Sequence, residues 1–136
     1  MKRLLPDRFI VAVDFDGTIT TEVDIGKELV LKEGCKETLA LLSNLGVDFI
    51  LWTCRSGPAL DEALNFLDRE GMLPMFKTVN AQLPEVVEKY APFEARKIGA
   101  DVYIDDKNLG LMKLFNINWP VIGSQIMLLM KEKTHV

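Results

Sequence analysis

A run of five apolar residues that ends in two closely spaced carboxylates constrains the fold of this chain more than any other feature. Phe9–Val13 is rich in β-branched residues and too short for a typical helix, so it predicts a buried strand. Asp14 and Asp16 follow, and Gly17 and Thr18 come directly after them. Because residues i and i+2 of an extended chain point to the same side, the strand delivers both carboxylates together at its carboxyl end.

Two carboxylates held this close repel each other, and any burial adds to the cost. A hard cation such as Mg²⁺ would relieve that cost, because it prefers oxygen ligands. A solvated turn after a strand is the structural alternative, since Asp, Gly and Thr are common turn residues.

Strands and helices alternate along the rest of the sequence, which predicts an α/β fold with a mainly parallel sheet. Continuous apolar runs are typical of parallel strands that are buried on both faces. We expect strands at Phe9–Asp14, Val47–Thr53, Phe76–Val79, Asp101–Asp105 and Pro120–Ile122, and helices at Cys35–Asn44, Pro58–Gly71, Pro84–Tyr90 with a resumption after Pro92 to Ile98, Leu109–Phe115 and Gln125–Lys133. Ligands of such sheets bind beyond the carboxyl ends of the strands, where Asp14, Thr53 and Asp105 are expected.

Length and composition predict one domain over residues 1–136, because 136 residues with 49% apolar content suffice for a single core. The net charge of −4 weighs against a nucleic-acid partner but is compatible with a small phosphorylated ligand. Cys35 and Cys54 form no CxxC motif, so neither a zinc site nor a disulfide framework is predicted. No apolar run approaches the roughly 18 residues of a membrane span, and we expect a cytoplasmic protein without a membrane partner.

Four motifs occur in one order along the chain. They are DFDGT from Asp14, the Thr53 of LWTCR, the Lys97 of EARKIGAD, and Asp105-Asp106 in YIDDKN. In this order they resemble the haloacid dehalogenase-like (HAD) phosphohydrolase superfamily. DxDGT is a specific signal, and the single-residue motifs add weight because they are in register with it.

The resemblance covers most of the chain, from Phe9 to Ile122, and implies a fold. That fold is a Rossmann-like three-layer sandwich with a five-stranded sheet in the order 5-4-1-2-3, which would place Asp14 and Asp105 on adjacent strands. Members of the superfamily often carry a cap inserted after the first motif or between the second and third. The spacings here leave room for a short flap only, so the chain is expected to be a small capless type.

The resemblance and the chemistry of carboxylates assign catalytic roles. Asp14 would attack a phosphoryl group and form an aspartyl-phosphate, and Asp16 would act as general acid and then general base. Thr53 would hydrogen-bond a phosphoryl oxygen, although a β-branched residue at the end of a strand needs no such role. Lys97 would bridge Asp14 and the phosphate. A solvated lysine near a helix end is its structural alternative, and Lys77 is a competing candidate.

The expected cofactor is Mg²⁺. Its implied ligands are the Asp14 side chain, the Asp16 main-chain carbonyl and the Asp105 side chain, with Asp106 holding a metal-bound water. Asp105 and Asp106 could also form a simple turn, so their metal role depends on their occurrence together with Asp14.

Two loops supply the expected substrate contacts. Gly17 lets the backbone turn tightly, so that amides in the turn formed by Phe15, Gly17 and Thr18 could donate to phosphate oxygens. Cys54 and Arg55 lie on the loop after Thr53. The Arg55 fork suits a second phosphate or a carboxylate on the substrate, with a surface salt bridge as the alternative.

The function expected from these residues is Mg²⁺-dependent hydrolysis of a phosphomonoester, with a small phosphorylated metabolite as substrate. One alternative is a nucleotide or nucleic-acid 3′-end phosphatase, because TCRSG and DDK also resemble the phosphatase domain of phage-type polynucleotide kinase/phosphatases. The other is a non-catalytic regulatory module that binds phosphate and Mg²⁺. Whether the protein forms a homo-oligomer is open, since the apolar residues Leu111, Met112 and Ile126–Met130 could cover the sheet or a second copy.

Overall fold

The computed structural model describes residues 5–21, 27–109 and 117–134. Its strands and helices alternate along the chain, which confirms the α/β prediction, and the sheet is parallel and Rossmann-like. The elements are β1 (Phe9–Val13), α1 (Cys35–Asn44), β2 (Val47–Leu51), α2 (Gly57–Arg69), the 3₁₀ turn η1 (Leu73–Met75), β3 (Phe76–Val79), α3 (Pro84–Tyr90), β4 (Val102–Ile104) and α4 (Trp119–Thr134). The helix expected at Leu109–Phe115 lies, apart from its first residue, outside the described residues.

The sheet has the order β3-β2-β1-β4, and every pair of neighbouring strands is parallel. The expected five-stranded order 5-4-1-2-3 is therefore wrong, because the described residues form four strands. β1 pairs with β2 on one side and with β4 on the other. The chain segments that follow β1 and β4 consequently start next to each other.

The segment expected as a fifth strand, Pro120–Ile122, lies in the first turn of α4. The buried positions Trp119, Ile122 and Ile126 recur every three to four residues, which is the period of a helix face. Asn118 precedes the helix, and its side-chain oxygen accepts a hydrogen bond from the Val121 amide at 3.2 Å. A short apolar run does not distinguish a strand from the start of such a helix.

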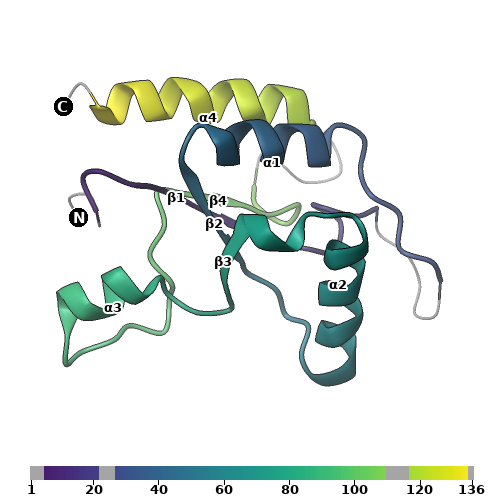
Figure 1. Ribbon diagram of the computed structural model, residues 1–136, viewed down its shortest axis with the longest axis horizontal. Coiled ribbons are helices and arrows are strands. Elements are labelled where there is room, and N and C mark those ends of the chain that lie inside the picture. Colours follow the sequence, from purple (N-terminus) through teal and green to yellow (C-terminus); the bar gives the residue numbers. More distant parts are fainter. Residues whose placement is uncertain (1–4, 22–26, 110–116, 135–136) are drawn as a thin grey trace.

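The helices are divided unequally between the two faces of the sheet. Figure 1 shows α4 alongside α1 over one face and α3 on the opposite side. The larger buried cluster joins alternate β1 residues, Phe9, Val11 and Val13, to side chains of α1, α2 and α4. The smaller cluster joins Ile10 and Ala12 to side chains of α3 and of the loop after it. This alternation follows from the two-residue period of a strand.

The chain does not return to a helix after Pro92, contrary to the sequence prediction, and residues 91–101 form a loop that leads into β4. Proline lacks an amide hydrogen and disfavours helical backbone in the residue before it. Within residues 91–101 only Ile98 is buried. The segment therefore has no apolar face that could hold a helix against the rest of the protein.

Part of the apolar C-terminal helix covers the sheet and part faces outward. Ile126 is buried, whereas Met127, Leu128 and Leu129 are exposed on α4. Leu111 and Met112 lie outside the described residues. Within the described ranges, no helix has the length and apolar character that crossing a bilayer requires.

Candidate active site

Three carboxylates meet at the carboxyl ends of two adjacent strands. Asp14 follows β1, and Asp105 and Asp106 follow β4. The Asp14 amide donates to the Ile104 carbonyl at 2.9 Å, so the pairing of the two strands continues up to the site. One oxygen from each carboxylate lies within 4.8 Å of the others. The parallel pairing of β1 with β4 thus brings together residues that are about ninety positions apart in the sequence.

This crowding changes the protonation of Asp14. Burial and the charges of Asp105 and Asp106 raise the pKa of Asp14 from 3.8 to about 7, although hydrogen bonds from Thr18 and the Phe15 backbone act in the opposite direction. A carboxylate that is costly to ionise beside two others is one that a bound cation would stabilise strongly.

Gly17 packs tightly against Asp106, a member of the cluster. Gly17 has φ +78°, and a Cβ placed there would lie 2.3 Å from Asp106 Oδ2. The other oxygen, Asp106 Oδ1, is buried and accepts no hydrogen bond from the described residues. An unsatisfied carboxylate oxygen that is buried beside two further carboxylates suits a hard divalent cation. The residues of this site therefore fit the expected metal.

Thr18 ties the two halves of the cluster together. Its hydroxyl accepts a hydrogen bond from the Asp106 amide at 2.9 Å and donates to Asp14 Oδ2 at 3.2 Å. Its carbonyl accepts a hydrogen bond from Trp119 Nε1 at 2.9 Å. Thr18, expected to bind substrate, therefore has its hydroxyl proton committed to Asp14. Phe15, also expected to bind substrate, is fully buried, and its backbone amide hydrogen-bonds the Asp14 carboxylate.

Asp16 and Arg55 form a two-point ion pair. Arg55 Nε donates to Asp16 Oδ2 and Nη2 donates to Oδ1, each at 2.8 Å. The Asp16 carboxylate is therefore directed toward the loop after β2, and it is not one of the three carboxylates of the cluster. Because its side chain contacts Arg55, Asp16 could offer a metal its main-chain carbonyl only. This agrees with the sequence-based expectation, which stays a prediction.

Thr53 lies on the same loop and is held through its backbone. Its amide donates to Asn80 Oδ1 at 2.8 Å, and its Oγ1 accepts a hydrogen bond from the Arg55 amide at 3.1 Å. Within the described part of the chain, the Thr53 hydroxyl donates to no protein group, so its proton is available to a ligand. Cys54 is exposed next to it.

Asn80 is a site residue that the sequence analysis missed. It follows β3 and has φ +53°, and its backbone N–H donates to the Leu51 carbonyl at 2.7 Å. Asparagine tolerates left-handed backbone better than most residues. The sequence feature that could have identified Asn80 is its position directly after the predicted strand Phe76–Val79.

Lys97 is not placed as expected. Its Nζ lies 5.0 Å from the centre of the Tyr103 ring, and no ion pair joins Lys97 to Asp14 in the described residues. It lines a cavity of about 510 Å³ that Asp105 and Trp52 also border. The competing candidate, Lys77, lies in β3 with an exposed side chain.

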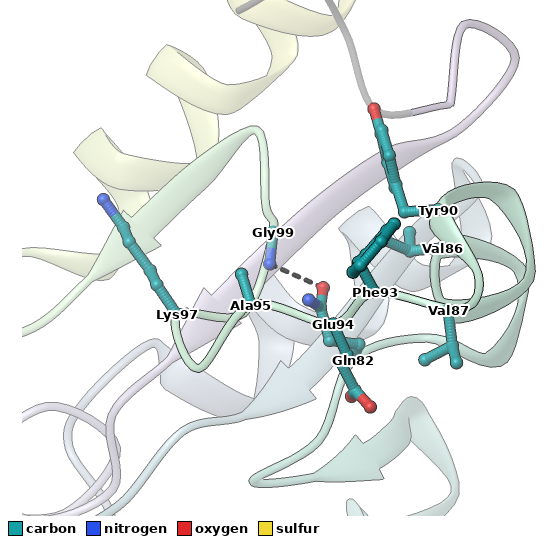
Figure 2. A pocket seen from close by; sticks show the side chains of 9 residues that line it. All are labelled: Gln82, Val86, Val87, Tyr90, Phe93, Glu94, Ala95, Lys97 and Gly99. Carbon is teal, nitrogen blue, oxygen red and sulfur yellow. Dashed lines mark hydrogen bonds between the residues drawn. The ribbon is translucent and has the colours of Figure 1, made fainter.

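A second cavity, of about 270 Å³, lies between α3 and the loop after it. Its walls are largely apolar and include Val86, Tyr90 and Phe93. Figure 2 shows the Lys97 side chain pointing away from these residues, and a hydrogen bond from the Gly99 amide to Gln82 that closes one side. No member of the carboxylate cluster lines this cavity.

The raised pKa of Asp14 predicts how stability depends on pH. The unfolded chain releases the Asp14 proton near pH 3.8, and the folded protein releases it near pH 7. Without metal, the free energy of unfolding should therefore decrease as the pH rises from about 4 to about 7. Because Asp14 is only half-buried, screening limits the loss to on the order of 1–2 kcal/mol. Mg²⁺ should reverse it. Thermal unfolding from about pH 4 to pH 8 in EDTA and in Mg²⁺ measures both effects.

In this experiment Asp14→Asn serves as the control, because it should remove most of the fall with pH. Equal unfolding midpoints in Mg²⁺ and EDTA near pH 8 would contradict a cation site at the three carboxylates.

A scan of known protein families finds no match to this chain, and comparison with curated proteins finds none either. Among solved structures, the chain is similar to a conserved protein coded by a locus of Bacteroides thetaiotaomicron, with 33% sequence identity and a TM-score of 0.70. The match covers 89% of this chain and 91% of that one. The chain therefore belongs to the same family as this conserved Bacteroides protein.

Proposed function

We propose that the protein is a Mg²⁺-dependent phosphomonoesterase of the HAD-like superfamily, acting on a small phosphorylated metabolite. The observation that carries the proposal is the meeting of Asp14, Asp105 and Asp106 at the carboxyl ends of adjacent parallel strands. The DxDGT motif and the available hydroxyl proton of Thr53 add support.

In the proposed reaction Asp14 is the nucleophile. Its carboxylate oxygen attacks phosphorus, the bond from phosphorus to the ester oxygen breaks, and an acyl phosphate forms on Asp14. Asp16, which has to carry a proton at this stage, gives that proton to the departing alkoxide and becomes a carboxylate. Water then attacks phosphorus, Asp16 takes the proton of that water, and inorganic phosphate leaves with Asp14 restored.

The other site residues hold the phosphoryl group. Thr53 would donate its hydroxyl proton to a phosphoryl oxygen. Lys97 would approach across the cavity that it shares with Asp105. Mg²⁺ would be held at the cluster of Asp14, Asp105 and Asp106, with the Asp16 main-chain carbonyl as a further ligand, and would offset the negative charge on the phosphoryl oxygens.

The test is hydrolysis of an aryl phosphate in Mg²⁺ and in EDTA. We expect turnover in Mg²⁺ only, and Asp105→Asn should lower it by about 10²-fold or more because a carboxylate of the cluster is lost. The matched control is Asp68→Asn, an exposed carboxylate on α2 that should leave turnover unchanged. Turnover that persists in EDTA would contradict the proposal.

A panel of sugar phosphates, nucleotides and 3′-phosphorylated oligonucleotides then ranks the substrates. A preference for the oligonucleotides, with KM rising steeply with salt, would favour an end phosphatase of nucleic acids over an enzyme of small metabolites. Binding of phosphate and Mg²⁺ without turnover of any substrate would favour the non-catalytic regulatory module.

A further inference from the structure

The pairing of Arg55 with Asp16 joins two loops that carry different motifs. Both oxygens of Asp16 accept hydrogen bonds from the guanidinium, at 2.8 Å each. A guanidinium is planar and presents its N–H groups in a fixed fork, so a two-point contact sets the orientation of the carboxylate as well as its position.

Arg55 is itself fixed by contacts that do not involve Asp16. Its Nη1 donates to the Ala59 carbonyl at 2.9 Å, its amide donates to Thr53 Oγ1, and its guanidinium carbon lies 5.1 Å from the centre of the buried Phe15 ring. The Arg55 side chain is 16% exposed, whereas that of Asp16 is 46% exposed. Arg55 is thus the anchored partner and Asp16 the accessible one.

We propose that Arg55 is a positioning residue that orients Asp16 for proton transfer and acts on the reaction through Asp16, and not by holding the substrate. This inference rests on the proposed function and replaces the expectation that Arg55 binds a second anionic group. All three guanidinium nitrogens already donate to protein oxygens, which leaves Arg55 poorly placed to bind a substrate anion while it holds Asp16. Misplacing a proton-transfer group by about 1 Å can cost ~10²-fold in rate.

A double-mutant cycle on the full chain tests the inference with an aryl phosphate as substrate. Asp16→Asn should lower kcat by about 10²–10⁴-fold, and Arg55→Gln by about 10–10²-fold with KM unchanged. The double variant should be no slower than Asp16→Asn, because Arg55 has no further route to the reaction. Glu62→Gln is the matched control, since Glu62 lies 3.8 Å from Arg55 Nη1 and plays no part in the proposal.

Two further measurements separate positioning from a merely structural role. Arg55→Gln should slow an alkyl phosphate more than an aryl phosphate, because the poorer leaving group depends more on the proton from Asp16. Arg55→Lys should restore part of kcat, because a lysine can make one contact with Asp16 but not two. If Arg55→Gln does not fold, Arg55→Lys takes its place in the double-mutant cycle.

The inference would be overturned if the fold-decreases in kcat of the two single variants multiplied in the double variant. A rise in KM with kcat unchanged in Arg55→Gln would also overturn it. In either case wild-type turnover that needs Mg²⁺ and Asp14 would leave the proposed function standing. A wild type without Mg²⁺-dependent turnover would overturn both.

Discussion

Replacing Asp14 with asparagine should abolish phosphatase activity and at the same time stabilise the metal-free protein. The amide is a poor nucleophile toward phosphorus, so we expect kcat to fall by about 10⁴-fold or more. The fold should tolerate the change, because asparagine has the same shape and its carbonyl can still accept the hydrogen bond from the Thr18 hydroxyl.

The gain in stability has an electrostatic origin. Above about pH 7 an ionised Asp14 is partly desolvated and faces Asp105 and Asp106, and the uncharged amide removes both costs. Activity assays in Mg²⁺ and thermal unfolding in EDTA measure the two halves of the prediction. Activity retained within about tenfold of wild type would exclude Asp14 as the nucleophile, and a lower unfolding midpoint would show that the three carboxylates do not repel one another.

Removing the carboxylate of Asp101 should destabilise the protein by about 3–5 kcal/mol, because it strands a buried charge. Lys133, in the last turn of α4, donates from Nζ to the two Asp101 oxygens at 2.9 and 3.0 Å and also to the Arg8 carbonyl. Only 7% of the Lys133 side chain and 13% of the Asp101 side chain are exposed. Asp101 Oδ2 also accepts a hydrogen bond from the Ile10 amide at 2.8 Å, which joins the pair to β1.

Denaturant unfolding of Asp101→Ala measures this loss. Glu85→Ala is a suitable control, because Glu85 makes a long, exposed contact of 3.9 Å with Arg8 and should change stability by less than about 0.5 kcal/mol. Replacing both partners, as in Asp101→Leu with Lys133→Met, should cost less than the two single changes combined. A loss below about 1 kcal/mol in Asp101→Ala would contradict the account of this pair as buried and coupled.

Much of the fold could be predicted because local signals and tertiary structure agree. The predicted bounds of α1, β3 and α3 match the structure, and those of β1, β2, α2 and β4 differ from it by at most two residues at either end. Continuous apolar runs followed by acidic or hydroxyl residues placed Asp14, Thr53 and Asp105 at strand ends, and strand pairing then brings Asp14 and Asp105 together. Such features depend on short stretches of chain.

The C-terminal helix shows where a stronger signal was overlooked. Asn118 as a capping residue, Pro120 in the first turn, and apolar residues at positions 119, 122 and 126 together indicate a helix. Reading Pro120–Ile122 by itself favoured a strand, because three apolar residues do not define a period.

Contacts between loops could not be predicted from the sequence. The hydrogen bonds from Arg55 to Asp16 and from Thr53 to Asn80 join segments 39 and 27 residues apart, and each depends on the backbone conformation of two loops. The position of Lys97 over Tyr103 depends in the same way on a loop that the sequence analysis took for a helix. Residue type identified these side chains as candidates, but only their packing determines which of them meet.

The most direct test of the central claim is to trap the phosphorylated enzyme. The wild-type protein is mixed with an aryl phosphate in Mg²⁺ and quenched in acid within one turnover, and its peptides are analysed by mass spectrometry. We expect a phosphate that hydroxylamine removes, located on Asp14 and absent from Asp14→Asn. Rapid turnover without such a phosphate, or with the phosphate on another residue, would contradict it.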